Sequence, residues 1–327
     1  MAGKTTSVVI VGAGGIARWH VQCMQAMGDA VRIAGFVEIA DKSRGLMTDK
    51  LKELGAKAVP PFYRTIKEFL AGNKGPADFA LIATPHSLHI SQIVECMRAG
   101  MDVLVEKPMV LSAAEARKAM KVRDETGRLL SVAFPGSYSP SITKAKELIA
   151  AGEIGEVRSI AAYVYQCWKT LSTGTWRQVP EISGGGFIFD TGSHTVNTMI
   201  ELAGSDIKSM QAMQDNAGAP VDITTVASGR FKNGIFFTLC GEGDSINCQN
   251  RIMVVGTKGA LICCNYGGSL KINKPDKWEE PVPFEKSKGV VEQFLRVRNN
   301  EIPNPCPAEV GLRFAKFMDM LRKAAAK

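Results

Sequence analysis

The first part of the chain alternates short, continuously apolar runs with longer stretches in which apolar residues recur every three or four positions. Continuous apolar runs are typical of strands buried on both faces, and the amphipathic stretches predict helices between them. We expect strands at residues 7–11, 32–38, 78–84, 102–106 and 129–134. Because connections between parallel strands are right-handed, this alternation predicts a doubly wound α/β unit around a parallel sheet.

Beyond Pro135 the pattern changes to runs in which polar and apolar residues alternate. Turns at Asn233-Gly234 and Lys258-Gly259 predict hairpins, so we expect this second sheet to be mostly antiparallel. Its strands are expected at residues 157–168, 207–215, 223–231, 235–241, 251–255, 260–264 and 269–272. We therefore predict one domain in residues 1–134 and another in residues 135–307. A final amphipathic helix, residues 308–326, is a candidate to pack back on the first domain.

The composition excludes several classes of protein. Of 327 residues, 45% are apolar and 22% are charged, which is ordinary for a globular protein and not for a disordered or collagen-like chain. The net charge of +8 comes from scattered residues without a dense basic block, so we expect no nucleic-acid partner. The eight cysteines lack zinc-ligand spacing, so we expect no metal site. No apolar run approaches a membrane span of roughly 18 residues, and we expect a cytoplasmic location with no membrane partner.

A glycine-rich motif follows the first predicted strand and opens a predicted helix. The motif has the form G-x-G-x-x-A and spans residues 12–17. The first glycine permits a tight turn, the second lets the backbone approach a pyrophosphate, and the alanine allows close packing of helix on strand. The helix N-terminus adds unpaired N–H groups and a positive dipole. We therefore predict a dinucleotide site that includes Gly12, Gly14, Gly15, Ile16 and Ala17.

Glu38 ends the second predicted strand, about 20 residues after the motif, where dinucleotide-binding folds carry an acidic residue. A carboxylate at this position accepts hydrogen bonds from the adenosine ribose hydroxyls and repels a 2′-phosphate. This favours NAD over NADP as the cofactor. Arg44 is near enough in the sequence to contact the adenine or a phosphate.

Two polar segments follow the third and fourth predicted strands. Ligands of doubly wound sheets bind at the carboxyl ends of the strands, so both segments are expected beside the cofactor. Lys107 has an amine that can exchange protons with a hydroxyl or polarise it, and the following Pro108 is a candidate for a cis bond. The expected cofactor contacts from the two segments are Thr84, Pro85, His86, His89, Glu106 and Lys107.

Three glycines, residues 184–186, precede Asp190 and His194. The glycines permit close approach of the backbone to a ligand. On one helix, Asp190 and His194 would be four residues apart and share a face, where a carboxylate can orient an imidazole that moves a proton. A buried, purely structural pair fits the same spacing.

Taken together, the glycine-rich motif, Glu106-Lys107-Pro108 and the segment from Gly184 to His194 resemble the glucose-fructose oxidoreductase / inositol dehydrogenase / MocA (Gfo/Idh/MocA) family. Residues 147–157 are similar to its interdomain helix and turn. The resemblance implies a nicotinamide-dinucleotide domain and a C-terminal domain with a large open sheet. It implies Lys107, Asp190 and His194 as the catalytic group. By the same resemblance, Arg177 lies near cofactor and substrate, and the substrate contacts are Lys107, Trp168, Arg177, Asp190 and His194.

The family implies hydride transfer between the nicotinamide and a carbinol or carbonyl carbon of a sugar, sugar derivative or cyclitol. Two alternatives remain: an NAD-dependent glycosidase or lyase that oxidises a sugar transiently, and a non-enzymatic NAD-binding regulator. Residues 135–138 and 163–169 depart from the family's pattern, so the resemblance does not identify the substrate. Trp168 either stacks on a sugar or belongs to the core. A broad open sheet has an apolar face to cover, which predicts a homo-oligomer, a dimer or a tetramer.

Overall fold

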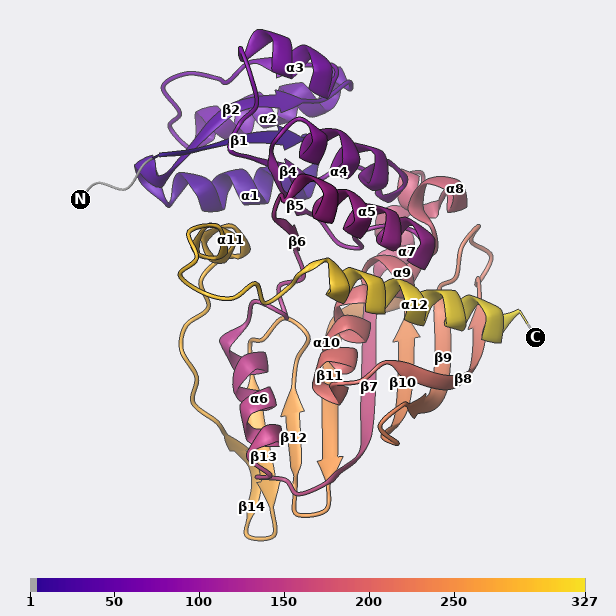
Figure 1. Cartoon of the computed structure of the whole chain (residues 1–327). Coiled ribbons are helices and arrows are strands. Elements are labelled where there is room, and N and C mark those ends of the chain that lie inside the picture. The colour runs from indigo at the N-terminus through magenta and orange to yellow at the C-terminus, as the bar shows by residue number, and fades with distance from the viewer. Residues whose placement is uncertain (1–4, 327) are drawn as a thin grey trace. The chain divides into compact units, whose positions relative to one another are not determined.

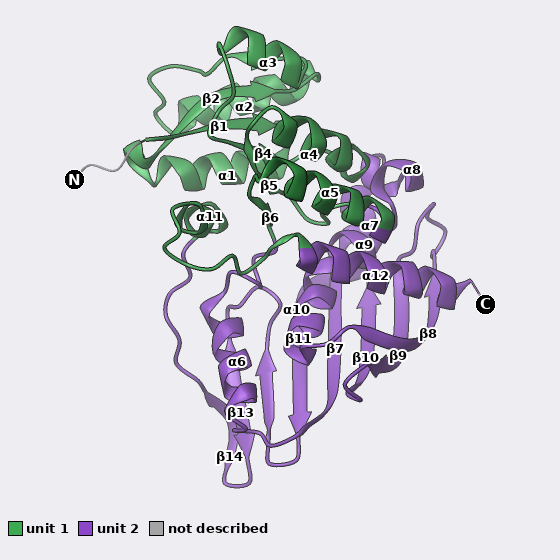
Figure 2. Ribbon diagram, in the orientation of Figure 1, with its two compact units in different colours: residues 1–110, 114–133, 289–308 green, residues 111–113, 134–288, 309–327 purple. Residues whose placement is uncertain are grey.

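The computed structural model describes residues 5–326, and the chain divides into two compact units (Figure 2). Unit 1 comprises residues 1–110, 114–133 and 289–308. Unit 2 comprises residues 111–113, 134–288 and 309–327. The expected boundary at residues 134/135 lies one residue from the main division.

Unit 1 contains a six-stranded sheet in the order β3-β2-β1-β4-β5-β6, with every neighbouring pair parallel (Figure 1). The strands are β1 (Thr6–Val11), β2 (Val31–Val37), β3 (Phe62–Tyr63), β4 (Phe79–Ile82), β5 (Asp102–Val105) and β6 (Leu130–Val132). The central strands β4 and β5 are buried along their whole length, as a sheet covered on both faces requires. This is the predicted doubly wound fold. The short β3 carries only two residues and no periodic pattern, and the sequence did not reveal it.

The helices of unit 1 lie between the strands of its sheet and in one later segment. They are α1 (Gly15–Gln25), α2 (Asp41–Glu53), α3 (Ile66–Gly72), α4 (His89–Arg98), α5 (Ala113–Thr126) and α11 (Val290–Arg298). The assignment of α11 corrects the predicted domains, because residues 289–308 were expected in the second domain. Phe294 of α11 packs on Phe79, with ring centroids 5.0 Å apart. Arg298 pairs with Asp78 and Asp102, and these contacts attach the segment to unit 1.

Unit 2 contains an eight-stranded sheet in the order β14-β13-β12-β11-β7-β10-β9-β8. The pair β7 and β10 is parallel and the other neighbouring pairs are antiparallel, which confirms the mostly antiparallel sheet. The strands are β7 (Val157–Cys167), β8 (Ile207–Asp215), β9 (Thr224–Phe231), β10 (Phe236–Glu242), β11 (Asp244–Gly256), β12 (Ala260–Cys263), β13 (Leu270–Lys274) and β14 (Lys277–Pro281).

The two faces of this sheet differ. Helices α10 (Ser193–Ala203) and α12 (Ala308–Ala325) lie along one face, where Phe237 packs on Phe317 at 5.7 Å between ring centroids (Figure 1). On the other face, cross-strand partners form an exposed or half-buried row. The row runs from Met213 through Val226, Cys240 and Tyr163 to Arg251.

The last helix corrects the second domain prediction. Residues 309–325 of α12 group with unit 2 and not with the parallel-sheet unit. Phe314 packs on Phe134 and Phe189, and Phe317 packs on Phe237. The apolar stripe predicted for this helix is therefore buried, but against the antiparallel sheet. Within residues 5–326, no helix is long and apolar enough to cross a membrane.

Candidate active site

The glycine-rich turn of unit 1 connects β1 to α1 and meets the requirements of a pyrophosphate cradle. Gly12 adopts a positive φ of +94°, and a Cβ added there would lie 2.7 Å from the Ala83 carbonyl oxygen. At Gly14 an added Cβ would meet no described atom within 4 Å, so the backbone is open on that side. Ala17 is buried where α1 packs on the sheet. The turn therefore fits a dinucleotide through its backbone N–H groups.

Glu38 lies against this turn. One carboxylate oxygen, Oε2, accepts a hydrogen bond from the Ala13 N–H at 2.8 Å. The other, Oε1, accepts from the N–H groups of Ile39 and Ala40, both at 2.9 Å. The Arg44 side chain donates to the Glu38 carbonyl at 2.7 Å. Glu38 thus holds the glycine-rich turn to the end of β2, which is where a ribose-binding carboxylate would be needed.

The segment after β4 is organised by His89. Its ring nitrogens lie 2.9 Å from the Thr84 carbonyl and 3.0 Å from the Pro108 carbonyl, and burial lowers the pKa of His89. The side chain is 0% exposed, which leaves the imidazole no surface with which to touch a cofactor. We therefore revise the predicted cofactor contact of His89: its buried ring packs between the loop after β4 and the loop after β5. His86 is buried as well, on the 3₁₀ turn η2 (His86–Leu88).

The segment Glu106-Lys107-Pro108 directly follows β5, and the Lys107–Pro108 peptide bond is cis, as the sequence suggested. Glu106 is buried, with its Oε1 2.7 Å from Nε2 of His20 in α1. Its Oε2 accepts the Lys107 N–H at 3.1 Å. The Glu106 carboxylate therefore orients the backbone of Lys107 within unit 1, and the Lys107 side chain is half-buried.

In unit 2, Asp190 ends the short helix α9 (Phe187–Asp190) and is 3% exposed. Its Oδ2 accepts hydrogen bonds from the Trp168 indole N–H and from Nε of Arg177, each at 2.9 Å. A carboxylate with two such donors has a fixed orientation. Trp168 is 4% exposed, and its ring packs on Phe187. This corrects the substrate-stacking interpretation of Trp168: it is a core residue that holds Asp190.

His194 does not share a helix with Asp190, which corrects a second expectation. Helix α9 ends at Asp190, residues Thr191 and Gly192 separate it from α10, and His194 lies in the first turn of α10. At Gly192 an added Cβ would lie 2.7 Å from the Ile188 Cα, so the glycine lets the two helices meet closely. The half-buried His194 ring contacts the rings of Phe134 and Tyr266, at 6.1 and 4.8 Å between centroids.

On the side where a Cβ would point, the three glycines before α9 approach protein atoms. A Cβ at Gly186 would overlap the Asp222 carbonyl oxygen, and one at Gly185 would lie 2.8 Å from the Phe189 Cβ. The Asp222 side chain accepts the Gly186 N–H at 2.7 Å. From α12, Arg322 donates to the Gly184 carbonyl at 2.7 Å. Asp222 and Arg322 thus fix the turn that places Asp190, and no sequence signal near Gly184 indicates either residue.

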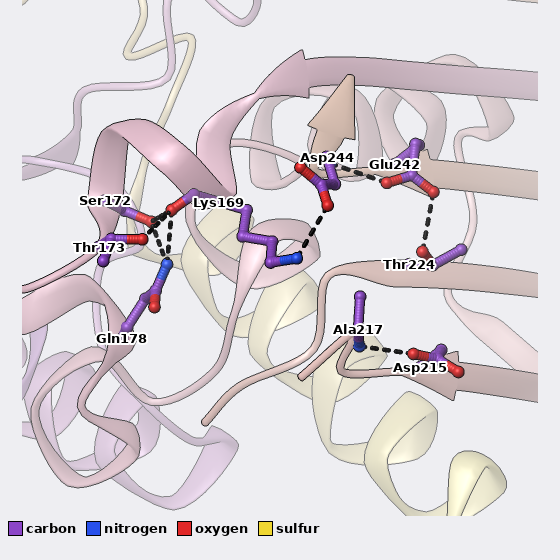
Figure 3. A network of polar contacts seen from close by, with 9 residues as sticks. All are labelled: Lys169, Ser172, Thr173, Gln178, Asp215, Ala217, Thr224, Glu242 and Asp244. Atoms are coloured by element: carbon purple, nitrogen blue, oxygen red, sulfur yellow. Dashed lines mark hydrogen bonds and ion pairs between the residues drawn. The ribbon is translucent and has the colours of Figure 1, made fainter. Parts of the chain in front are cut away.

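The segment that carries Trp168 and Arg177 is held by a separate polar network (Figure 3). Lys169 of α7 (Trp168–Ser172) pairs with Asp244, with Nζ 2.9 Å from Oδ2. Gln178 of the 3₁₀ turn η3 (Trp176–Gln178) donates to the Lys169 carbonyl at 2.7 Å. The network closes a turn, so the two donors to Asp190 are presented from one compact segment.

The segment at residues 135–138, which departs from the family's pattern, lies inside unit 2. Ser137 is buried and forms a hydrogen bond with Glu201 of α10. Asn197 donates to the Ser137 hydroxyl at 2.9 Å, and burial raises the pKa of Glu201. In the structure these side chains form an internal polar cluster.

Comparison with known families matches two adjoining parts of the chain. Residues 6–134 match an oxidoreductase family with an NAD-binding Rossmann fold, and residues 142–262 match the GFO/IDH/MocA C-terminal domain. The chain therefore belongs to the Gfo/Idh/MocA family of oxidoreductases, and residues 6–134 form its NAD-binding Rossmann unit. This confirms the resemblance, the fold class and the cofactor class predicted from the sequence.

Similar proteins include "Oxidoreductase P35" of Formosa agariphila, 25% identical over 73% of this chain and 76% of that protein. D-xylose 1-dehydrogenase [NADP(+)] of Haloarcula marismortui is 26% identical over 60% of this chain and 56% of its own length. scyllo-Inositol 2-dehydrogenase (NADP(+)) IolW of Bacillus subtilis is 28% identical over 49% of this chain and 44% of its own length. The structure of GenD2 from gentamicin A biosynthesis in complex with NAD superposes with a TM-score of 0.83 at 22% identity, covering 100% of this chain and 96% of that one. This likeness concerns the fold.

Proposed function

We propose that the protein is an NAD-dependent dehydrogenase that transfers a hydride between nicotinamide and a carbinol or carbonyl carbon of a sugar, sugar derivative or cyclitol. The observation that carries the proposal is that each unit holds one of the predicted catalytic residues in place: the Glu106 carboxylate accepts the Lys107 backbone N–H in unit 1, and Trp168 and Arg177 fix the Asp190 carboxylate in unit 2. Relatives named as a D-xylose and a scyllo-inositol dehydrogenase support the substrate class.

The proposed roles follow from the chemistry of each side chain. The nicotinamide supplies the hydride acceptor or donor when it is bound. In the oxidation direction, the His194 imidazole accepts the proton of the substrate hydroxyl. The Lys107 ammonium donates a hydrogen bond to the same oxygen and stabilises its developing negative charge. The Asp190 carboxylate orients the imidazole or accepts a hydrogen bond from a neighbouring hydroxyl.

We propose NAD in preference to NADP for this chain, although two of the relatives are named with NADP(+). Glu38 carries the argument. Its carboxylate lies at the glycine-rich turn, bonded to the Ala13 N–H, and its negative charge would repel a 2′-phosphate there. The adenosine ribose of NAD, in contrast, supplies hydroxyl donors to such a carboxylate.

The test is a panel of D-xylose, other aldoses, sugar acids, scyllo-inositol and myo-inositol, incubated with NAD and followed by NADH absorbance. We expect stoichiometric NADH with at least one compound. A glycosidase or lyase would cleave its substrate without net NADH. A regulator would bind NAD, as measured by calorimetry, and turn over none of the panel. Either result would replace the dehydrogenase proposal.

We also propose that the protein forms a homo-oligomer, a dimer or a tetramer, through the uncovered face of the unit 2 sheet. Met213 is 72% exposed and Val226 is 43% exposed, and the two are cross-strand partners in the row described above. Apolar side chains in such a row favour burial against another surface. Light scattering is expected to give a mass above that of one chain, and the double variant Met213→Asp/Val226→Asp should give a smaller one. A monomeric parent protein would contradict this.

The proposed location is the cytoplasm. The eight cysteines are all free, with Cys96, Cys263 and Cys306 buried as ordinary apolar side chains. Thiols of this kind suit a reducing compartment.

A further inference from the structure

The loop between β12 and β13 is anchored beside His194. Asn265 is fully buried, and its side-chain amide donates to the Thr195 hydroxyl at 3.0 Å, one residue after His194. Its backbone N–H donates to the Asn250 side chain in β11 at 2.8 Å. At Gly267, which has a φ of +75°, an added Cβ would overlap the Ser139 hydroxyl. The loop is therefore held from two sides, which fixes the residue between Asn265 and Gly267.

That residue is Tyr266, and its ring lies against the His194 ring. The centroids are 4.8 Å apart and the ring planes are inclined by 53°. Phe134 also contacts the imidazole, at 6.1 Å, but Phe134 is 1% exposed whereas Tyr266 is 44% exposed. Of these two aromatic neighbours of His194, Tyr266 is the one with surface to offer a ligand.

The hydroxyl of Tyr266 remains a hydrogen-bond donor at neutral pH. Partial desolvation of the phenol, with a further contribution from the nearby Asp190 carboxylate, raises the pKa of Tyr266 to about 12. A neutral phenol combines an apolar ring with one polar group. Cyclic sugars and cyclitols present the complementary surface, because their C–H groups form apolar patches edged by hydroxyls.

We propose that Tyr266 is a substrate-contacting residue of the same site: its ring packs on the C–H face of a cyclic polyol, and its hydroxyl donates to a hydroxyl beside the reacting carbon. This proposal rests on the proposed function, because it assumes that His194 acts on the same substrate. It adds a residue from the loop between β12 and β13 to those that contact the substrate. It also favours ring-shaped substrates over open-chain alcohols, which present no such face to a tyrosine.

The kinetic test compares Tyr266→Phe and Tyr266→Leu, with the panel compound that gives NADH as substrate. Tyr266→Phe keeps the ring and loses one hydrogen bond, so we expect KM to rise about two- to tenfold with kcat within threefold of the parent. Tyr266→Leu also loses the aromatic contact, and we expect kcat/KM to fall about 10- to 100-fold. Tyr63→Phe in β3 of unit 1 removes the hydroxyl of a tyrosine whose ring packs on Phe69, and it should change neither constant.

A second measurement does not depend on turnover. The chain has four histidines, so selective labelling gives four sets of imidazole NMR signals, and His194→Ala identifies the set of interest. Tyr266→Leu should shift the His194 signals because it removes the adjacent ring, whereas Tyr266→Phe should leave them nearly in place. Unshifted signals in Tyr266→Leu, or unchanged KM and kcat in both variants while His194→Ala is inactive, would overturn the role of Tyr266. An active His194→Ala would instead overturn the proposed function.

Discussion

Replacing His194 with alanine is expected to lower kcat by about 10²–10⁴-fold while NAD still binds, because the variant loses its proton acceptor and leaves the glycine-rich turn unchanged. Lys107→Ala should have a similar effect, since the developing charge on the substrate oxygen loses its hydrogen-bond donor. Initial rates with the panel substrate give kcat, and calorimetric titration with NAD gives the affinity of each variant for the cofactor.

Lys121→Ala is the matched control for the lysine. Lys121 is an exposed residue of α5 whose only described ion pair joins it to Glu125 at 3.8 Å. This variant should retain the kcat of the parent protein. If either His194→Ala or Lys107→Ala kept near-parental turnover with a confirmed substrate, the residue concerned would have no catalytic role.

Gly186→Ala is expected to lower both the stability of the protein and its turnover. The added methyl group would overlap the Asp222 carbonyl oxygen, so the turn or the Asp222 segment must shift. Overpacking of this kind costs about 1–3 kcal/mol in the free energy of unfolding, which urea denaturation measures. Because α9 begins at the next residue, the shift should also displace Asp190 and lower kcat.

Gly45→Ala supplies the comparison for Gly186→Ala. Gly45 lies in the interior of α2, and an added Cβ would meet no described atom within 4 Å. Alanine should therefore stabilise the protein by up to about 1 kcal/mol through helix propensity. Equal behaviour of the two variants would contradict the steric explanation for Gly186.

The sequence predicted most of the parallel sheet because its longer strands are continuous apolar runs, and some of them lead directly into a recognisable motif. Val11 runs into the glycine-rich motif, and Val105 runs into Glu106 and Lys107. The antiparallel sheet of unit 2 was predicted through its hairpin turns, whereas the end of the unit was placed wrongly at residue 307. The segment with Phe294 and Arg298 could not be assigned in this way, because its attachment to unit 1 depends on contacts with Phe79 and Asp102, far away in the chain.

The candidate site was predicted by residue type and not by the contacts that organise it. For Trp168 the sequence left a sugar-stacking role and a core position both open, because nothing in the sequence shows that its indole N–H donates to Asp190. The glycines before Asp190 indicated close approach correctly, but the groups that approach their Cβ sides are protein atoms, among them the Asp222 backbone at Gly186. Tyr266 lies in a short loop without a motif, and its contact with His194 arises only from the fold of the sheet.

His89 has a mechanical consequence for unit 1. The buried His89 ring lies between the carbonyl oxygens of Thr84 and Pro108, and a neutral imidazole donates its one N–H to only one of them. Packing against this one side chain therefore couples the loops after β4 and β5. A shift imposed at one loop is transmitted to the other through a side chain that itself touches no solvent. Binding of the cofactor against the loop after β4 would then also change the position of the Lys107 amine in the loop after β5.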